Sequence, residues 1–246
     1  MIQAVSAPSV DSTLGSKLLP GLLGLTAGTV DVISFLGLGG LFAAHITGNL
    51  VILAAHLVNS GVTPVAHILC VPVFMAALGL TRLLAGGLEV LGLATLRPLL
   101  ALQALLLAGV FILGVNAGAP FDPTAPRAVT AGMLAVSAMA VQNALVQISL
   151  TGAPSTAVMT TNITRFTMDI GTMLLKRDPH EMSRARERAW RTGAAIAGFV
   201  VGCGLGAACE VVYSLWSLLL PAGLAVAALG LAFNVSAGAV VHRGSR

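Results

Sequence analysis

Charged residues are scarce in this chain of 246 residues, at 9%, whereas a soluble domain carries about a quarter. Hydrophobic residues make up 57% of the chain, and they form several runs close to the roughly 20 residues that one membrane-spanning helix needs. The scarcity of charge therefore excludes an ordinary soluble domain. We expect an all-α polytopic integral membrane protein whose spans fill nearly the whole chain.

Aromatic residues, at 4%, and cysteines, of which there are 3, are also few. Cys70, Cys203 and Cys209 lie in apolar runs without CxxC spacing, which favours small core residues over metal ligands or a disulfide framework. The net charge of +4 comes from basic residues beside apolar runs, as is typical of orientation in a membrane and not of nucleic-acid binding. Since the sequence holds no catalytic, phosphate-binding or metal motif, we expect no enzymatic activity, no cofactor and no nucleic-acid partner.

The apolar runs and the Gly, Pro and polar breaks between them predict eight helical segments. Their ranges are 18–36, 41–59, 63–86, 96–117, 127–150, 155–176, 190–213 and 217–241. Residues 1–16 contain Asp11 and no Lys or Arg, so they lack the basic region of a secretory signal and are expected to form a disordered tail. Residues 17–246 are expected to form a single transmembrane domain.

One break is rich in charge: the stretch from Lys176 to Arg191 holds six basic and three acidic residues. Cytoplasmic loops carry the excess of Lys and Arg, so this loop and both termini are expected on the cytoplasmic side. If all eight segments cross the membrane, Arg82 and Arg97 flank an outside loop. If segments two and six are broken or re-entrant, six segments cross and both arginines fall inside. The arrangement of six full spans plus two broken or re-entrant helices follows the charge rule better and is preferred over eight full spans.

An internal repeat is indicated by two polar stretches, HITGNLVIL in segment two and NITRFTMDI in segment six, which align Ile46–Asn49 with Ile163–Phe166. The helix before each stretch also carries a polar position, Asp31 in GTVDVISF and the amides in AVQNALVQ. We therefore expect two similar four-segment halves, about 17–117 and 127–241. The halves would be inverted if three segments of each half cross, and parallel if four cross.

Polar side chains inside apolar segments are costly in a membrane and are candidates for a substrate or ion site. The carboxylate of Asp31 can bind a cation, take up a proton, or pair with Arg165 of the other half, although Asp169 lies four residues after Arg165 and is the simpler partner. The structural alternative is packing, because Thr and Asn hydrogen-bond between membrane helices. The full set of candidates is Asp31, His45, Thr47, Asn49, Gln142, Asn143, Thr161, Asn162, Arg165 and Asp169.

The stretch GTVDVISFLGLGGLFAAHITGNLV, together with VQNALV and TTNITR in the second half, resembles the YoaK-like family of bacterial membrane proteins, known as domain of unknown function family 1275. The resemblance covers nearly all of the chain after the tail. It implies a polytopic protein of the bacterial inner membrane with about six spans and no securely assigned activity. The chain differs from the family pattern at Thr164, Arg165 and Phe166, where the second repeat usually has Thr-Gly-Thr.

Matched broken segments with polar residues inside the membrane favour a transporter or facilitator of an unidentified small solute, with its site between segments one, two, five and six. The alternative is a non-transporting membrane scaffold or assembly protein whose basic loop contacts a cytoplasmic protein. The predicted partners are thus the lipid bilayer and a small molecule or ion, and a homo-oligomer is compatible with the sequence.

Overall fold

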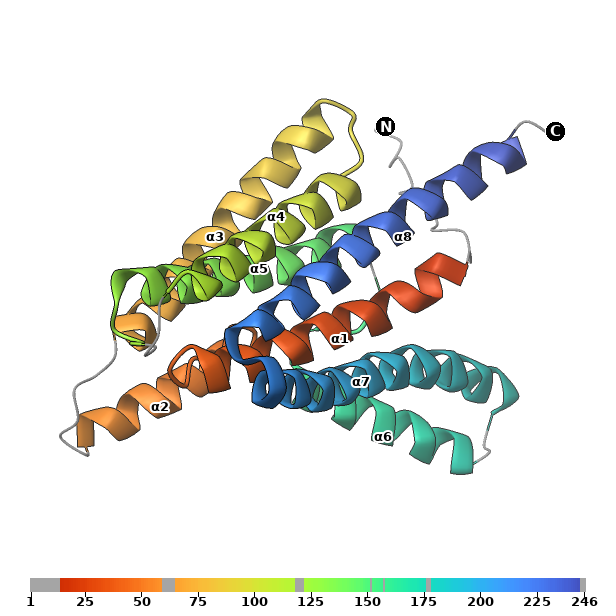
Figure 1. Ribbon diagram of the computed structural model, residues 1–246. Coiled ribbons are helices and arrows are strands. Elements are labelled where there is room, and N and C mark those ends of the chain that lie inside the picture. Colours follow the sequence, from red (N-terminus) through yellow and green to blue (C-terminus); the bar gives the residue numbers. More distant parts are fainter. Residues whose placement is uncertain are drawn as a thin grey trace.

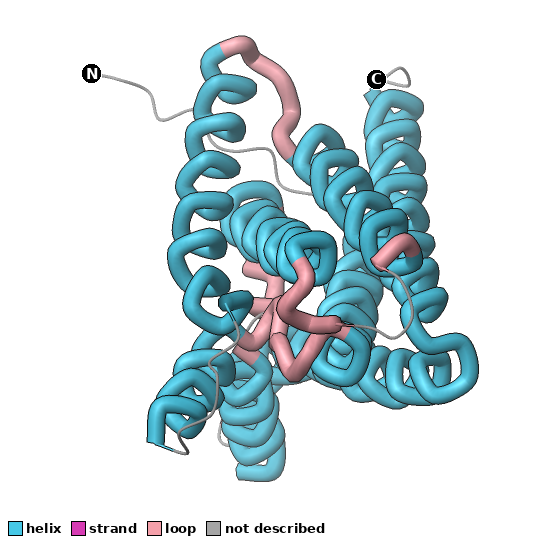
Figure 2. The backbone as a smooth tube through the Cα atoms, turned by 60° about the vertical axis from the view of Figure 1, so that its left-hand side comes forward, coloured by secondary structure: helices cyan, strands magenta, loops and turns pink. Residues whose placement is uncertain are grey.

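A computed structural model describes residues 14–58, 65–117, 122–150, 152–156, 158–175 and 178–243 of the chain (Figure 1). These residues form eight α-helices and one short 3-10 helix, and they contain no strand (Figure 2). The elements are α1 (Leu14–Gly37), α2 (Ile46–Val58), α3 (Val65–Val90), α4 (Leu96–Val115), α5 (Pro126–Ser149), α6 (Met159–Leu175), α7 (Pro179–Tyr213), η1 (Ser214–Leu218) and α8 (Leu219–Arg243). Every predicted segment corresponds to one of the helices, which confirms the all-α fold class.

The largest differences from the predicted helix starts are at α1, α2, α6 and α7. α2 begins at Ile46 and α6 at Met159, because the residues before each helix form a non-helical segment. α7 begins at Pro179 and not at residue 190, since Pro179 suits the first helical position and Asp178 accepts a hydrogen bond from the N–H of His180. Most of the stretch predicted to be a charged loop is therefore helical.

The predicted N-terminal tail, residues 1–16, is cut short by α1. That helix begins at Leu14, so residues 14–16 are helical. Residues 1–13 lie outside the described part of the chain, as do Lys176 and Arg177 of the charged stretch.

Six of the described helices reach the length of a membrane crossing. The stretches long and apolar enough to cross are Leu18–Gly37, Val65–Val90, Leu96–Val115, Pro126–Ser149 and Pro179–Phe233. The last of these comprises α7 and α8, between which the chain turns back at η1 (Figure 1). α2 has only 13 residues, about 20 Å at the helical rise of about 1.5 Å per residue, which is shorter than the roughly 30 Å hydrocarbon core. The chain is thus a polytopic membrane protein with six long and two shorter helices.

The helix contacts fall into matched pairs when the two halves are exchanged. α1 packs on α7 as α5 packs on α3, and α1 packs on α8 as α5 packs on α4. In the same way α2 lies on α3 and α6 lies on α7, while α4 and α8 contact each other. The two short helices lie at opposite ends of the helix bundle (Figure 1). The expectation that segments two and six meet is therefore wrong, because each packs against the following long helix of its own half.

α1 and α7 approach each other more closely than larger side chains would allow. A Cβ atom added at Gly24 of α1 would lie 2.5 Å from the backbone oxygen of Ala195. A Cβ atom at Gly198 or Gly202 of α7 would overlap a backbone oxygen of α1. Small residues spaced four apart let membrane helices pack backbone to backbone, and this seam fixes α1 against α7.

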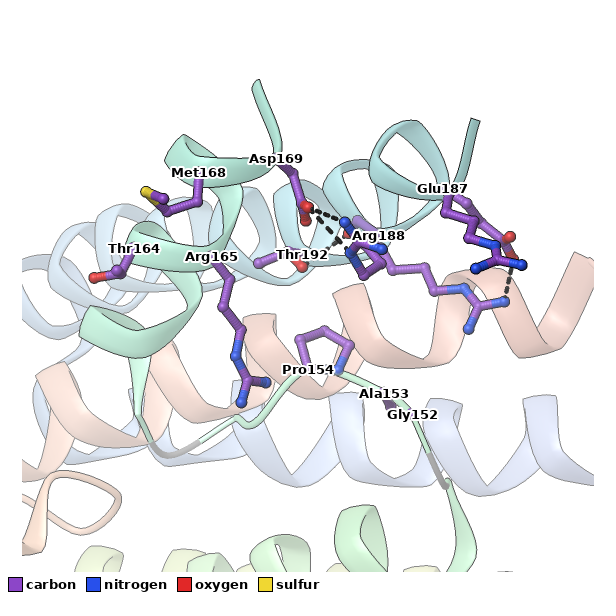
Figure 3. A pocket seen from close by; sticks show the side chains of 12 residues that line it. Gly152, Ala153, Pro154, Thr164, Arg165, Met168, Asp169, Glu187, Arg188 and Thr192 are labelled. Atoms are coloured by element: carbon purple, nitrogen blue, oxygen red, sulfur yellow. Dashed lines mark hydrogen bonds and ion pairs between the residues drawn. The ribbon is translucent and has the colours of Figure 1, made fainter. Parts of the chain in front are cut away.

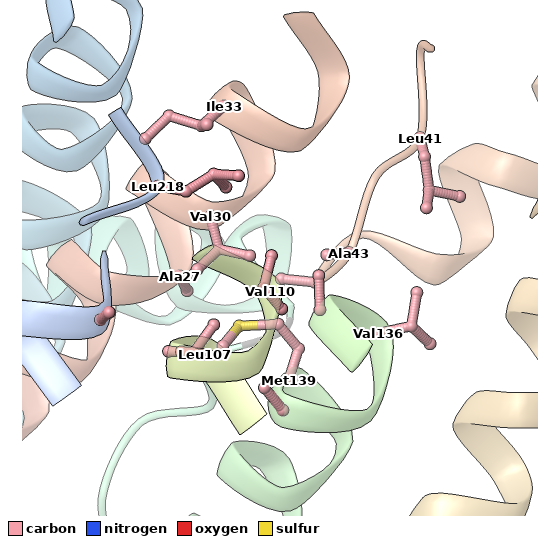
Figure 4. Close-up of a cluster of buried hydrophobic side chains, with 14 of the residues drawn as sticks. Ala27, Val30, Ile33, Leu41, Ala43, Leu107, Val110, Val136, Met139 and Leu218 are labelled. Atoms are coloured by element: carbon pink, nitrogen blue, oxygen red, sulfur yellow. The ribbon is translucent and has the colours of Figure 1, made fainter. Parts of the chain in front are cut away.

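The non-helical residues 38–45 between α1 and α2, here called the first entry segment, are held inside the bundle. Leu41 and Ala43 of this segment are fully buried. They belong to a hydrophobic cluster that also contains Val30 of α1 and Val136 of α5 (Figure 4). Non-helical backbone at this depth needs hydrogen-bond partners within the protein. The second entry segment, residues 150–158 with Thr151 and Ala157 outside the described part, precedes α6 in the same way.

Candidate functional site

Asn49, fully buried in the first turn of α2, holds the first entry segment through two hydrogen bonds. Its Oδ1 accepts from the N–H of Phe42 at 2.9 Å, and its Nδ2 donates to the carbonyl oxygen of Phe42 at 2.6 Å. An amide side chain carries both a donor and an acceptor, so one asparagine can satisfy both backbone groups of a residue. The contact, here called the first clasp, replaces the hydrogen bonds that water would otherwise make.

Asn162 makes the corresponding contact in α6, here called the second clasp. Its Nδ2 donates to the carbonyl oxygen of Ser155 at 2.5 Å, and Ser155 precedes it by seven residues, as Phe42 precedes Asn49. The Oδ1 of Asn162 is buried and accepts no hydrogen bond within the described residues. The second clasp is therefore only half satisfied.

The two clasps fix how the halves correspond. Since the asparagines match, Ile46–Asn49 corresponds to Met159–Asn162. The predicted alignment with Ile163–Phe166 is therefore wrong, because it followed a shared Ile-Thr pair, whereas the backbone contacts depend on the asparagine. Arg165 is accordingly not the counterpart of Gly48 and lies further along its helix.

The carboxylate of Asp31 holds the start of α2. Asp31 is 4% exposed, and its Oδ1 accepts hydrogen bonds from the N–H groups of Ala44 at 2.6 Å and His45 at 3.3 Å. The N–H groups at a helix start have no partner within the helix, and the helix dipole favours a negative charge there. Asp31 thus caps α2 from a neighbouring helix. Within the described residues no cation forms a salt bridge with it.

Asn143 on α5 takes the corresponding place in the second half. Its Oδ1 accepts a hydrogen bond of 3.5 Å from the hydroxyl of Thr156, which follows it by thirteen residues. Ala44 follows Asp31 by the same thirteen residues. A polar side chain of the preceding long helix thus bonds a residue thirteen positions later before each short helix. Its chemistry differs, with a carboxylate in the first half and a neutral amide in the second.

Gln142, the neighbour of Asn143, makes a contact that joins three helices. Its Nε2 donates to the carbonyl oxygen of Leu23 in α1 at 3.0 Å, and its Oε1 accepts from Nε2 of Gln103 in α4 at 2.6 Å. Gln103 is not among the candidates predicted from the sequence. In the sequence it is recognisable as a lone amide in the apolar run LRPLLALQALLLAG. In the described part of the chain, its buried Oε1 has no hydrogen-bond partner.

His67 of α3 is a second residue that spacing alone did not place in a site. Its ring is 1% exposed, and Nε2 lies 3.2 Å from the carbonyl oxygen of Gly40 in the first entry segment. The thiol of Cys70 donates to the carbonyl oxygen of His67. α3 therefore supports the first entry segment in addition to α1 and α2. The sequence feature that could have indicated this contact is a lone histidine near the start of an apolar helix.

The remaining polar candidates are less enclosed. The side chains of His45 and Thr47 are exposed at the α2 end, and Thr161 is half-buried on α6. The candidates therefore do not converge on one point between segments one, two, five and six. Asp31, Asn49, Asn143 and Asn162 contact the entry segments, whereas Gln142 joins α1, α4 and α5.

Asp169 pairs with Arg188 of α7 and not with Arg165. Its Oδ1 accepts from Nε of Arg188 at 3.0 Å and from Nη2 at 2.6 Å (Figure 3). Arg165 is exposed and forms no salt bridge within the described residues. Both predicted partners of Arg165, Asp31 and Asp169, are therefore wrong, because the guanidinium fork of Arg188 offers the Asp169 carboxylate two donors at once.

The described arginines other than Arg127 gather at one end of the bundle. Arg127 lies in the first turn of α5, a helix that begins at the opposite end (Figure 1). The other end includes the close of α3, the start of α4, and the region where α6 and α7 meet (Figure 1). The arginines there are Arg82, Arg97, Arg165, Arg184, Arg186, Arg188 and Arg191.

A protein-family model described as "Protein of unknown function (DUF1275)" matches residues 19–231 of the chain. The chain belongs to the DUF1275 family. The resemblance stated from the sequence motifs is thereby confirmed. In this DUF1275 protein, Asp31 and Asn49 from those motifs make the hydrogen bonds that hold the first entry segment. No curated protein and no solved structure matches the chain.

Proposed function

We propose that this DUF1275 protein is a carrier or facilitator for a small solute in the bacterial inner membrane, and that it carries out no covalent chemistry. The observation that carries the proposal is the buried carboxylate of Asp31, which lies in a spanning helix and caps a short helix that follows a break. Ionisable residues within spanning segments mark substrate or ion pathways by default. Paired interrupted segments at matching places in two halves are typical of secondary transporters.

The two halves are proposed to be inverted repeats. Three long helices and one short helix in each half give the halves opposite orientations, and the matched helix contacts and the matched clasps support this relation. In the resulting topology the arginine-rich end and both chain termini lie in the cytoplasm. The first entry segment then faces the outside and the second faces the cytoplasm.

Each entry segment is proposed to act as one gate. Asp31 is the charge-coupling residue of the outer gate, because any proton or cation that reaches its carboxylate weakens the hydrogen bonds to Ala44 and His45 that hold α2. Asn143 and Asn162 form the inner gate, which responds to no charge. Gln142 and Gln103 offer amide groups between the two gates, where a neutral polar solute would find hydrogen-bond partners.

The test is uptake by purified protein in lipid vesicles. Vesicles are incubated with a defined mixture of amino acids, organic acids and sugars, and their contents are measured by mass spectrometry against protein-free vesicles. At least one solute is expected to accumulate, and Asp31→Asn is expected to reduce its uptake at least tenfold. Asp122→Asn is the matched control, because Asp122 is an exposed carboxylate whose described hydrogen bonds come from Thr124 and Ala125, both beside it in the chain.

Two results would oppose the proposal. Contents equal to those of protein-free vesicles for every solute would favour the scaffold alternative. Uptake that is unchanged in Asp31→Asn would leave a carrier but remove Asp31 from its mechanism.

A further inference from the structure

A cavity of about 540 Å³ lies where the second entry segment, α6 and α7 meet (Figure 3). It is separate from both clasps, and its lining is strongly basic. Four of the lining side chains are arginines and two are carboxylates. The charged lining residues are Arg165, Arg184, Arg188, Arg191, Asp169 and Glu187.

The two carboxylates neutralise two of the four arginines. Asp169 pairs with Arg188 at 2.6 Å, and Glu187 pairs with Arg191 at 2.5 Å. Arg165 of α6 and Arg184 of α7, the remaining two, form no salt bridge within the described residues.

Two guanidinium groups without a counter-charge therefore line one cavity. Like charges on facing elements repel each other unless an anion lies between them. In Figure 3, Arg165 extends from α6 toward the segment that carries Pro154, so its guanidinium group lies at the cavity and not in the α6–α7 contact.

The surface around the cavity has the character of a membrane interface. Met168, which lines the cavity, is 68% exposed, and Ile163 on the same helix is 52% exposed. Trp190 of α7 is 73% exposed, and tryptophan is enriched at the level of lipid headgroups. Met168 thus gives the basic cavity an exposed apolar edge, and Ile163 and Trp190 are exposed on the same two helices.

We propose that this cavity binds the phosphate-bearing headgroup of an anionic phospholipid, with Arg165 and Arg184 as its donors. The planar fork of a guanidinium group matches two phosphate oxygens, and its charge persists at any physiological pH. The exposed Met168 and Ile163 favour a lipid over a soluble phosphate, because they give the acyl chains a place to lie. This proposal does not rest on solute transport, because its donors Arg165 and Arg184 belong to neither clasp, although the second entry segment lines part of the cavity.

The test measures lipid binding by native mass spectrometry on the purified full chain. The probes are phosphatidylglycerol and, as the zwitterionic reference, phosphatidylcholine, and the quantity compared is the ratio of their dissociation constants for the first bound lipid. Wild-type protein is expected to prefer phosphatidylglycerol. Each of Arg165→Gln and Arg184→Gln is expected to lower the preference about fivefold, from about 1 kcal/mol per basic residue near an anionic lipid surface.

Arg186→Gln is the matched control, because Arg186 is an exposed arginine on the same helix that does not line the cavity. The preference is expected to persist in this variant and in Arg165→Lys, which keeps the charge. Thermal unfolding in phosphatidylcholine checks that every variant is folded.

Three outcomes would overturn the proposal. The first is a wild-type protein without preference for phosphatidylglycerol. The second is an equal loss in Arg186→Gln and Arg165→Gln, which would mean general surface charge. The third is displacement of the lipid by inorganic phosphate at millimolar concentration, which would assign the cavity to a soluble anion.

Discussion

In the first half a buried carboxylate and a fully bonded asparagine hold the entry segment, whereas in the second half two amides do so with fewer hydrogen bonds. Asp31 accepts from two backbone N–H groups, while Asn143 accepts one longer bond from a hydroxyl. Asn49 bonds both backbone groups of Phe42, while one atom of Asn162 has no partner among the described residues. The same backbone plan is thus built with strong contacts at one end and weak contacts at the other.

The glycine contacts of α7 and of α5 also differ in what they meet. α7 packs on α1 through glycines whose missing side chains let backbone meet backbone. On α5, a Cβ atom added at Gly132 would meet a side chain, the end of Leu41, and not a backbone. The difference teaches that backbone fixes the α1–α7 contact, whereas a side chain that can turn makes the contact of α5 with the first entry segment.

The largest expected effect is on the α1–α7 seam. Gly202→Ala places a methyl group against the backbone oxygen of Leu25, which no rotamer change relieves, and a loss of about 3 kcal/mol or more in unfolding free energy is expected. Gly132→Ala is the matched variant and is expected to change stability by less than about 1 kcal/mol, because the Leu41 side chain can turn and alanine favours a helix. Thermal unfolding in detergent micelles measures both. Equal losses would mean that the two seams are equally rigid.

A smaller difference is expected between the two capping positions. Asp31→Ala leaves the N–H groups of buried Ala44 and exposed His45 without their acceptor. The expected loss is about 2 kcal/mol, since an unsatisfied buried donor costs about 1–3 kcal/mol. Asn143→Ala removes a single contact of 3.5 Å and should cost about 1 kcal/mol or less. Hydrogen exchange at the start of α2 should rise in Asp31→Ala alone. A larger loss in Asn143→Ala would reverse the ranking of the two ends.

The smallest difference is expected between the two clasps themselves. Asn49→Ala removes two hydrogen bonds to Phe42 and should cost about 2 kcal/mol, while Asn162→Ala removes one bond to Ser155 and should cost about half as much. Asn49→Asp is the informative control, because a carboxylate keeps the acceptor for the Phe42 N–H but loses the donor for its carbonyl group. Unfolding curves of the three variants would disagree with this account if Asn162→Ala proved the most damaging.

The order and type of the helices could be predicted from the sequence because each long apolar run has the length of a crossing. The breaks before Asn49 and Asn162 could also be predicted, since polar residues interrupt apolar runs there. Asp31 stood out for a physical reason: a lone carboxylate in an apolar helix has to find partners within the protein.

The partners themselves could not be predicted. Asp169 has Arg165 four residues away, yet it pairs with Arg188 on another helix, and only the packing of α6 on α7 decides that choice. The predicted alignment of Ile46–Asn49 with Ile163–Phe166 is wrong for a related reason. It rests on the shared Ile-Thr pair, whereas the backbone contact is made by the asparagine. The contact of His67 with the first entry segment and that of Gln103 with Gln142 depend on how the helices pack, which the sequence alone does not reveal.

The central claim is that the two halves are inverted, with α2 and α6 on opposite sides of the membrane. It is tested by labelling single cysteines with a membrane-impermeant maleimide in a background without Cys70, Cys203 and Cys209. Val58 ends α2 and is 83% exposed, and Leu175 ends α6 and is 63% exposed. We expect Val58→Cys to be labelled from outside the cell and Leu175→Cys from the cytoplasm. Labelling of both from the cytoplasm would mean eight full spans and would contradict the account.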